Sequence, residues 1–334
     1  MGDRMRKKRD SKFELLRILS MIMIISSHFS LYGNWQNKNS NIIKTMQFQP
    51  WGQIGVYLFV MISGYFLSTK DLNFKLAWNR VLPLWEKTIL YSIFCLFLAF
   101  ILKLGTVNLK SIIKGVFPIS FNQYWFMTSF IVLMLITPLL NYLVNNFNKG
   151  TLQFSLLGII LIADIYPLFG NSPLGGTLSA SVLISAYLIA ACIRKYEISI
   201  KYWISILLII LGLSGQYYSM YLMNVLHQGP LRFTNGILPL ISAVGIFLIF
   251  LNLPSFYNRS INFLASSVLA AYLITMHQTI YEWFWQTFLN VGKFQASPWL
   301  TFIGLGVSLL IVICCCLVDK IFKFAKVQLS KWKI

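Results

Sequence analysis

The chain has 334 residues, of which 57% are hydrophobic and only 11% are charged. Soluble globular domains have about 25% charged residues, so this composition excludes a soluble fold and indicates an integral membrane protein. The net charge of +19 would suit a nucleic-acid-binding protein, but the basic residues gather at the ends of apolar runs. We therefore expect membrane lipids around the protein and no nucleic-acid partner. The five cysteines lie in apolar stretches without metal-ligand spacing, so we expect no metal.

Ten apolar stretches along the chain are each long enough to cross a bilayer, which takes about 20 residues. They lie at 13–33, 52–69, 82–102, 122–144, 152–170, 175–193, 202–220, 233–252, 262–281 and 298–319. These stretches predict an all-α, polytopic membrane protein of about ten transmembrane helices.

The orientation follows from the lysines and arginines, which favour the cytoplasmic side. With the N-terminus inside, 19 of them fall in inner segments and 7 in outer segments. We expect a multi-pass protein of the cell membrane with both termini cytoplasmic. Residues 1–12 and 320–334 would be basic tails around a single transmembrane domain at 13–319. The outer loop from Lys103 to Lys114 is the exception, because it is basic although it faces outward.

The first span carries Arg17 and His28, which are eleven residues apart. That spacing places both on one helix face, roughly 16 Å apart along the axis. A cation and an imidazole in a span are costly unless they face a protein interior or a wet cavity, so the pair predicts a functional site. The simpler alternatives are that Arg17 reaches the inner headgroups and that His28 bonds a neighbouring helix.

Depth along the predicted spans groups the remaining polar residues. His277 in the ninth span should lie level with His28 in the outer half, near Asp164 and near Trp125, which opens the fourth span. These three are candidates for the acceptor side, although each also has a structural interpretation. Arg17 and Arg80 should lie near the inner face. A histidine suits general-base chemistry, and the arginine fork suits a phosphate or carboxylate.

Five ordered motifs resemble the membrane acyltransferase-3 family. They are Arg17-x10-His28, Gly52 to Leu67 with Ser63-Gly64-Tyr65, Arg80-Val81-Leu82-Pro83, Tyr124-Trp125-Phe126-Met127, and Ser266 to His277 with Tyr272-Leu273-Ile274. The resemblance covers about residues 10 to 320. The family often has a second arginine three residues before Arg80, where this chain has Ala77.

The resemblance implies transfer of an acyl group, usually acetyl from cytosolic acetyl-CoA. The implied acceptor is a sugar hydroxyl of a bacterial surface polysaccharide or its lipid-linked precursor, outside the membrane. His28 becomes the catalytic imidazole, either as general base or as carrier of the acetyl group, and these roles stay open. Arg17 becomes a donor-binding or site-organising residue, and Arg80 a second candidate for the CoA phosphates.

Two other functions fit the sequence. A transporter or flippase of glycans or lipid-linked sugars would also have many spans, but no inverted repeat or pair of broken helices supports it. A structural subunit of a polysaccharide assembly complex would tolerate apolar residues at Arg17 and His28.

Overall fold

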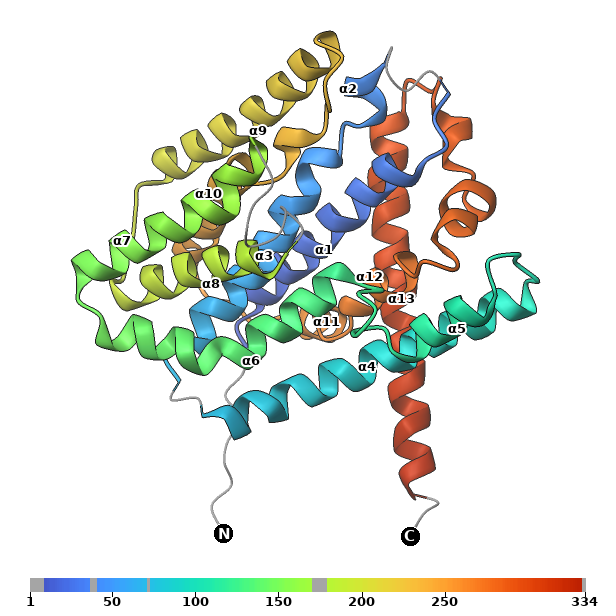
Figure 1. Ribbon diagram of the computed structural model, residues 1–334, viewed down its shortest axis with the longest axis horizontal. Helices are drawn as coiled ribbons and strands as arrows, with labels where there is room; N and C mark the ends of the chain where they lie inside the picture. Colours follow the sequence, from blue (N-terminus) through green and yellow to red (C-terminus); the bar gives the residue numbers. More distant parts are fainter. Residues whose placement is uncertain (1–8, 37–40, 71–72, 170–178, 332–334) are drawn as a thin grey trace.

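The computed structural model describes residues 9–36, 41–70, 73–169 and 179–331, and all regular structure in these ranges is helical (Figure 1). The all-α prediction is thus confirmed. The helices are α1 Ser11–Tyr32, α2 Ile42–Thr45, α3 Gln49–Leu67, α4 Phe74–Ile101, α5 Leu109–Val116, α6 Trp125–Asn146, α7 Lys149–Ile160, α8 Ala180–Lys195, α9 Tyr202–Val225, α10 Ile237–Asn252, α11 Arg259–Ala265, α12 Leu269–Thr275 and α13 Leu300–Lys331. Short π and 3-10 turns (η) join them: η1 Leu161–Ile165, η2 Tyr166–Leu168, η3 Arg232–Thr234, η4 Trp283–Phe288 and η5 Val291–Phe294.

Eight helical segments of the described chain are long and apolar enough to cross a membrane. They are Ser11–Tyr32, Ile42–Leu67, Phe74–Ile101, Trp125–Asn146, Lys149–Leu168, Tyr202–Val225, Arg232–Asn252 and Leu300–Gln328. Two predicted spans are not among them. The stretch 175–193 begins outside the described residues, and α8, which covers most of it and ends at Lys195, has 16 residues. The stretch 262–281 is divided into two seven-residue helices, α11 and α12.

Helices α1 and α10 run in opposite directions, and so do α3 and α9, as side-chain bonds between their ends show. At one end, Lys12 near the start of α1 donates to the Leu251 carbonyl at 3.1 Å, near the end of α10. At the other end, Tyr217 of α9 donates to the Gln47 carbonyl at 2.6 Å, just before α3. We call the end where α1 begins the basic end. Helix α13 also ends there (Figure 1), while residues 1–8 and 332–334 of the predicted basic tails lie outside the described residues.

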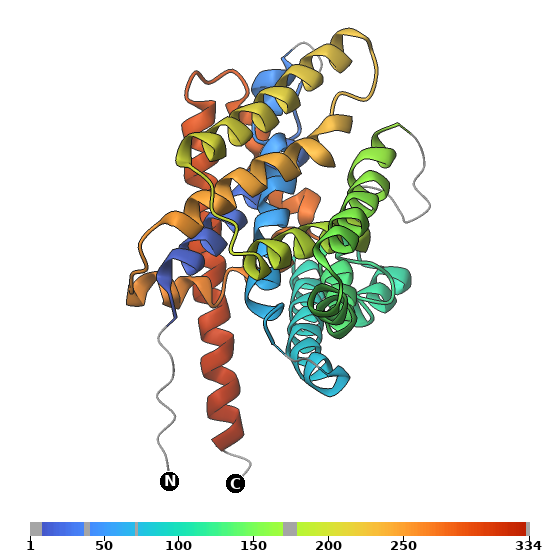
Figure 2. The same cartoon turned by 90° about the vertical axis from the view of Figure 1, so that its left-hand side faces the viewer.

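Helix α3 lies at the centre of the bundle and packs closely on α1 and α8 because glycines line the contacts. A Cβ at Gly55 would lie 2.5 Å from the Ser20 carbonyl oxygen of α1. A Cβ at Gly64 would lie 2.6 Å from the Tyr187 carbonyl oxygen of α8. Small residues at helix contacts let backbones approach within the membrane, where packing rather than hydrophobicity drives association. Helices α9 and α10 lie side by side along one face of the bundle (Figure 2).

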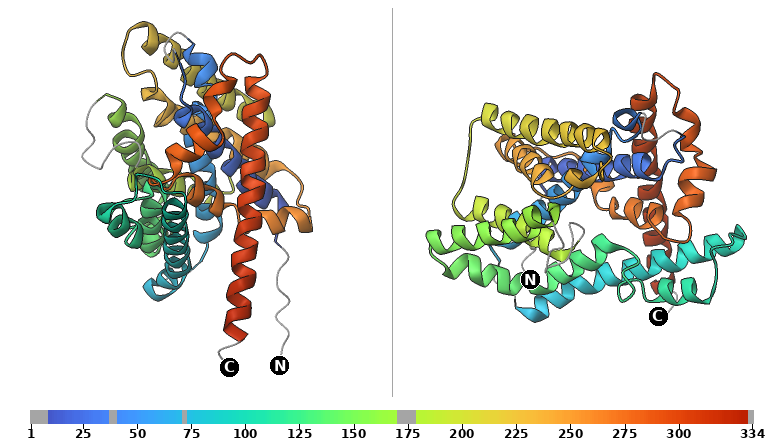
Figure 3. Two further views of the ribbon diagram at one scale, coloured as in Figure 1. Left: turned by 90° about the vertical axis from the view of Figure 1, so that its right-hand side faces the viewer. Right: turned by 45° about the horizontal axis from the view of Figure 1, so that its top comes forward.

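Helix α13 is joined to α4 by buried charges. Asp319 of α13 is 2% exposed and lies 2.7 Å from Lys87 of α4 and 2.6 Å from Lys323. Tyr91 donates a hydrogen bond to the same carboxylate at 2.8 Å. At 32 residues, α13 is about 48 Å long, longer than the roughly 30 Å hydrocarbon core of a bilayer. The chain therefore stays helical past residue 319, where we predicted a tail, and reaches beyond the other helices at the basic end (Figure 3).

Candidate functional site

His28 lies near the end of α1, with its imidazole inside the bundle. The residue is 7% exposed, and Nδ1 is buried with no hydrogen-bond partner among the described residues. Two tyrosine rings flank it: Tyr32 one turn later at 5.8 Å between ring centres, and Tyr272 of α12 at 6.2 Å. A buried imidazole nitrogen without a partner is unusual, since buried polar atoms are nearly always hydrogen-bonded. In the tautomer that carries its hydrogen on Nε2, this nitrogen has a free lone pair, which can accept a proton or attack an incoming group.

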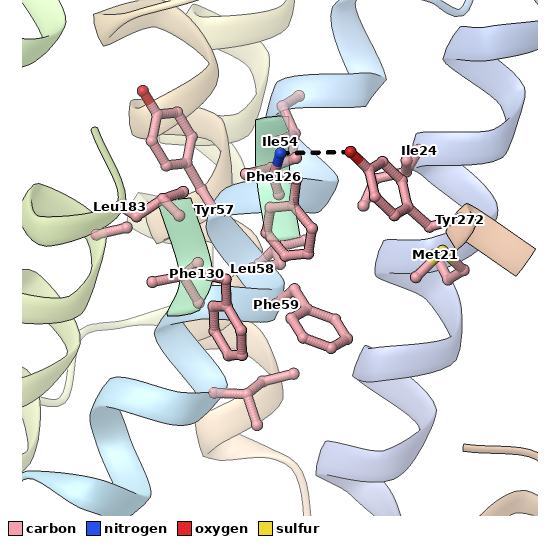
Figure 4. Close-up of a cluster of buried hydrophobic side chains, with 14 of the residues drawn as sticks. Met21, Ile24, Ile54, Tyr57, Leu58, Phe59, Phe126, Phe130, Leu183 and Tyr272 are labelled. Atoms are coloured by element: carbon pink, nitrogen blue, oxygen red, sulfur yellow. Dashed lines mark hydrogen bonds between the residues drawn. The ribbon is translucent and has the colours of Figure 1, made fainter. Parts of the chain in front are cut away.

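Tyr272 holds this region to the start of α6. Its hydroxyl accepts a hydrogen bond from the Phe126 backbone N–H at 3.3 Å (Figure 4). Tyr124 lies beside it, with ring centres 6.0 Å apart, and donates to the Leu273 carbonyl at 3.0 Å. Both tyrosines are buried, with at most 2% of each residue exposed. These bonds fix α12 against α6, and with them the ring that faces His28.

His277 completes the same group of aromatic side chains, because its ring centre is 5.9 Å from that of Tyr124. It is fully buried. Its Nδ1 accepts a hydrogen bond from the Thr279 backbone N–H at 3.2 Å, and its Nε2 lies 3.2 Å from Ser92 Oγ. The structure thus connects His28 to His277 through Tyr272 and Tyr124. We call His28, Tyr32, Tyr272, Tyr124 and His277 the histidine–tyrosine cluster.

The sequence predicts that His277 lies on a continuous ninth span. The structure shows instead that this span is broken. Helix α11 ends at Ala265, α12 ends at Thr275, and His277 follows in a turn. The break is stabilised from α13, where Lys323 Nζ donates to the Ser266 carbonyl at 2.9 Å and Lys320 Nζ to Ser266 Oγ at 2.6 Å. A broken helix is tolerated at membrane depth where other groups satisfy the freed backbone, and Lys323 does so for the Ser266 carbonyl.

Arg17 lies at the other end of α1, toward the basic end. Its guanidinium is 2.6 Å from Glu14, one turn earlier, and 6.0 Å from the centre of the Phe59 ring. The Glu14 side chain is 9% exposed and also lies 4.0 Å from Arg9. Two cations therefore surround one buried carboxylate. Any anion that binds Arg17 would meet a guanidinium whose orientation Glu14 already fixes.

The other predicted site residues are more scattered. Arg80 is half-buried in α4, about 9 Å along the helix from its start, and has no ion pair with a described carboxylate. Trp125 is the first residue of α6, between two residues that contact Tyr272. Asp164 in η1 accepts a hydrogen bond from Tyr57 of α3 at 2.5 Å. No described contact brings Arg80 or Asp164 to the histidine–tyrosine cluster.

The structure adds four residues that sequence reasoning did not single out: Tyr272, Tyr124, Ser92 and Gln123. The first two lie inside motifs that resemble the family, but the resemblance assigned no function to these two tyrosines. No sequence signal indicated Ser92 or Gln123, because both contact His277 from more than 150 positions away. No group of three or more histidine, cysteine, aspartate or glutamate side chains in the described chain could hold a metal ion.

The fold and site define a polytopic membrane protein with a buried histidine cluster inside its helical bundle. Residues 10–318 match the acyltransferase-3 family model, described as an acyltransferase domain. The chain belongs to this family and is a membrane acyltransferase. The family assignment does not favour a transporter or flippase. Comparisons with curated proteins and with solved structures give no match.

Proposed function

We propose that the protein transfers acetyl from cytosolic acetyl-CoA to a sugar hydroxyl of a bacterial surface polysaccharide or its lipid-linked precursor. The observation that carries the proposal is the buried Nδ1 of His28, which lacks a partner among the described residues. The membership of the chain in the acyltransferase-3 family supports the reaction class. The excess of lysine and arginine at the basic end supports a cell-membrane protein with this end in the cytoplasm.

In this proposal the donor reaches the bundle from the basic end. Arg17 binds or orients the CoA phosphates, because its fork offers paired donors to an anion, and Arg80 is a second candidate for them. The acceptor approaches from the opposite end, where Trp125 and His277 lie. Asp164 is a weaker candidate for this side, since its carboxylate already accepts the Tyr57 hydroxyl.

His28 can act in two ways. As a general base, it accepts the proton of the sugar hydroxyl while that oxygen attacks the thioester carbonyl, and it returns the proton to CoA, which leaves as the thiol. As an acyl carrier, its nitrogen attacks the thioester first, and CoA leaves as the thiol with the proton of the imidazole; the sugar oxygen then takes the acetyl group, and the freed imidazole takes the hydroxyl proton. Both routes need a neutral imidazole at the moment of attack.

Membrane vesicles, labelled acetyl-CoA and a surface-glycan fraction test the proposal. We expect His28→Asn to lower transfer about 100-fold or more, the usual range for a general base. The same replacement at the exposed His227 is the matched control and should leave transfer unchanged. Equal transfer by wild type and His28→Asn, at equal protein levels, would refute the catalytic role.

Two further measurements test donor binding by Arg17 and the chemical role of His28. We expect Arg17→Lys to raise the KM for acetyl-CoA more than it lowers kcat, because lysine keeps the charge but loses the fork. Rapid measurement of CoA release without acceptor distinguishes the two roles of His28. A burst of about one CoA per wild-type protein that is absent from His28→Asn identifies an acyl carrier, and no burst identifies a general base.

A further inference from the structure

A polar pocket of about 260 Å³ opens beside His277, at the end of the bundle opposite the basic end. It lies where α4 has ended, between α5, the turn before α6 and the turn after α12. Its lining residues are Thr106, Asn108, Lys110, Ser111, Lys114, Gln123, Gln278 and Thr279. One water occupies about 30 Å³ in the liquid, so the pocket has room for a group as large as a sugar ring or a phosphate.

Residues that contact the His277 imidazole form the base of the pocket. Gln123 and Thr279 both line the pocket, and both contact the His277 imidazole. Thr106 Oγ1 donates to the Thr279 carbonyl at 2.9 Å, which fixes this wall against the loop after α4. A group bound in the pocket is therefore one side chain away from the histidine–tyrosine cluster.

Gln123 supplies an unpaired polar group at this base. It is 5% exposed, its amide nitrogen lies 3.2 Å from His277 Nε2, and its amide oxygen has no hydrogen-bond partner among the described residues. Thr279 N–H donates to Nδ1 of His277, so the neutral imidazole carries its hydrogen on Nε2. Two acceptors lie 3.2 Å from Nε2: Ser92 Oγ and, because amide oxygen and nitrogen are interchangeable in shape, the Gln123 amide oxygen. When Gln123 turns its oxygen toward the imidazole, its NH₂ is available to a ligand that accepts hydrogen bonds.

The charge of the pocket is positive. Lys110 and Lys114 lie one turn apart on α5, no acidic residue lines the pocket, and neither lysine has an ion pair with a described carboxylate. These lysines belong to the loop that departs from the charge asymmetry of the chain. Lysines are under-represented in such outer segments. The charge asymmetry therefore does not explain Lys110 and Lys114, whereas binding of an anion in the pocket does.

Helix α5 also indicates the depth of the pocket. Its other face carries Leu109, Ile112, Ile113 and Val116, which are 39–75% exposed. Gly115 lets this helix pack against Leu96 of α4. A helix with an exposed apolar face and a lysine-bearing face lies in the plane of the membrane–water boundary. The pocket therefore faces the level at which the headgroup of a lipid-linked substrate lies.

We propose that this pocket binds an anionic group of the sugar acceptor, either a phosphate or a carboxylate. The inference rests on the proposed function and names the acceptor as an acidic or phosphorylated glycan. Lys110 and Lys114 attract the anion, and the Gln123 amide donates a hydrogen bond to it. In the proposed function the CoA phosphates bind at the basic end, so the anion in this pocket belongs to the acceptor.

Binding to the purified protein in neutral detergent tests this proposal without acyl transfer. The probes are glucose 1-phosphate, glucuronate and neutral glucose, measured by equilibrium dialysis. We expect one or both anionic sugars to bind at least about tenfold more tightly than glucose, and Lys110→Gln/Lys114→Gln to remove that difference. Lys44→Gln, an exposed lysine on α2 away from the pocket, is the matched control and should bind as wild type. Lys110→Arg/Lys114→Arg should retain binding, which separates lost charge from lost folding.

Each outcome decides between the assignments. Preference for glucose 1-phosphate identifies a phosphate as the anion, and preference for glucuronate identifies a carboxylate. Equal binding of all three sugars, or unchanged binding by the glutamine variant, overturns the inference. Displacement of both anionic sugars by phosphatidylglycerol nanodiscs, but not by phosphatidylcholine nanodiscs, assigns the pocket to a membrane lipid and also overturns it. The transfer assay separates this inference from the proposed function. If His28→Asn loses transfer while Lys110→Gln/Lys114→Gln keeps it, this inference fails and the proposed function stands. If wild type does not transfer at all, the proposed function fails.

Discussion

The imidazole of His28 and the phenol ring of Tyr272 lie 6.2 Å apart across the contact between α1 and α12. The hydroxyl of Tyr272 is already engaged, since it accepts a hydrogen bond from the Phe126 N–H at the start of α6. The tyrosine therefore has two separable tasks. Its ring lies beside His28, and its hydroxyl holds α6 and α12 together.

The two tasks of Tyr272 predict different effects of two substitutions. Tyr272→Phe keeps the ring but leaves the buried Phe126 N–H without an acceptor, so we expect a loss of stability of about 1–3 kcal/mol. Transfer per folded molecule should stay within a few-fold of wild type. Tyr272→Ala removes the wall beside His28 and should lower transfer strongly. Thermal unfolding in detergent, with transfer normalised to folded protein, checks both. A loss of transfer in Tyr272→Phe as large as that in His28→Asn would instead give the hydroxyl a part in the reaction.

Asp164 and Tyr57 should be coupled in stability. Tyr57 is fully buried on α3 and donates to Asp164 at 2.5 Å and to the Gly236 carbonyl at 3.3 Å. A double-mutant cycle with Tyr57→Phe and Asp164→Ala should give a coupling free energy of about 1–3 kcal/mol, the range for residues within one hydrogen-bond network. Unfolding in mixed micelles measures it. Tyr57→Phe should keep its transfer activity, and additive effects of the two substitutions would contradict the pairing.

The Asp319 carboxylate should be one of the most sensitive positions for stability. Asp319→Ala leaves Lys87 as a largely buried cation without its partner, and the loss of one member of a buried pair costs about 3–5 kcal/mol. Glu86 and Lys326 form a matched exposed pair between the same helices, with side chains 53% and 80% exposed. Glu86→Ala should change stability by less than about 1 kcal/mol. The two variants are compared by thermal unfolding. Similar midpoints would show that the buried Asp319 pair stabilises the protein no more than the exposed Glu86 pair.

Gly55 should not tolerate a side chain. A methyl group there would lie 2.5 Å from the Ser20 carbonyl, so Gly55→Ala should separate α1 from α3 and cost about 1–3 kcal/mol. Gly306 of α13 has open space around it, and Gly306→Ala should be neutral or stabilise the helix by up to about 1 kcal/mol. Unfolding midpoints of the two variants test the difference. Because Gly55 faces the helix that carries His28, Gly55→Ala should also reduce transfer.

The sequence predicted most of the fold because hydrophobic length is a direct signal in membrane proteins. The stretch 13–33 corresponds to α1, Ser11–Tyr32, and 202–220 lies within α9, Tyr202–Val225. The prediction was wrong at 262–281, where apolar composition alone does not reveal a break. The break is held by Lys320 and Lys323 of α13, which bond Ser266 from more than 50 residues away, and composition along the stretch does not show such contacts.

The site was less predictable than the fold. Helical spacing placed Arg17 and His28 on one helix and separated them along it, which needs only local geometry. The contacts that define the surroundings of His28 and His277 come from Tyr272, Tyr124 and Ser92, each on a different helix or turn. Such contacts are set by the packing of whole helices. Periodicity and depth along a span do not specify them.

The broken segment α11–α12 has a consequence for the order in which the protein is assembled. Each of these helices has seven residues and rises about 10 Å, about a third of the hydrocarbon core, so neither can cross the bilayer alone. Their place in the membrane depends on the side chains of α1, α4 and α13 that surround them. Helix α13 follows α11 and α12 in the chain and supplies Lys323, which donates to the Ser266 carbonyl in the break. Helix α1 can therefore insert with His28 before α11 and α12 exist, whereas the position of α12, and of His277 after it, depends on helices that lie on both sides of it in the chain.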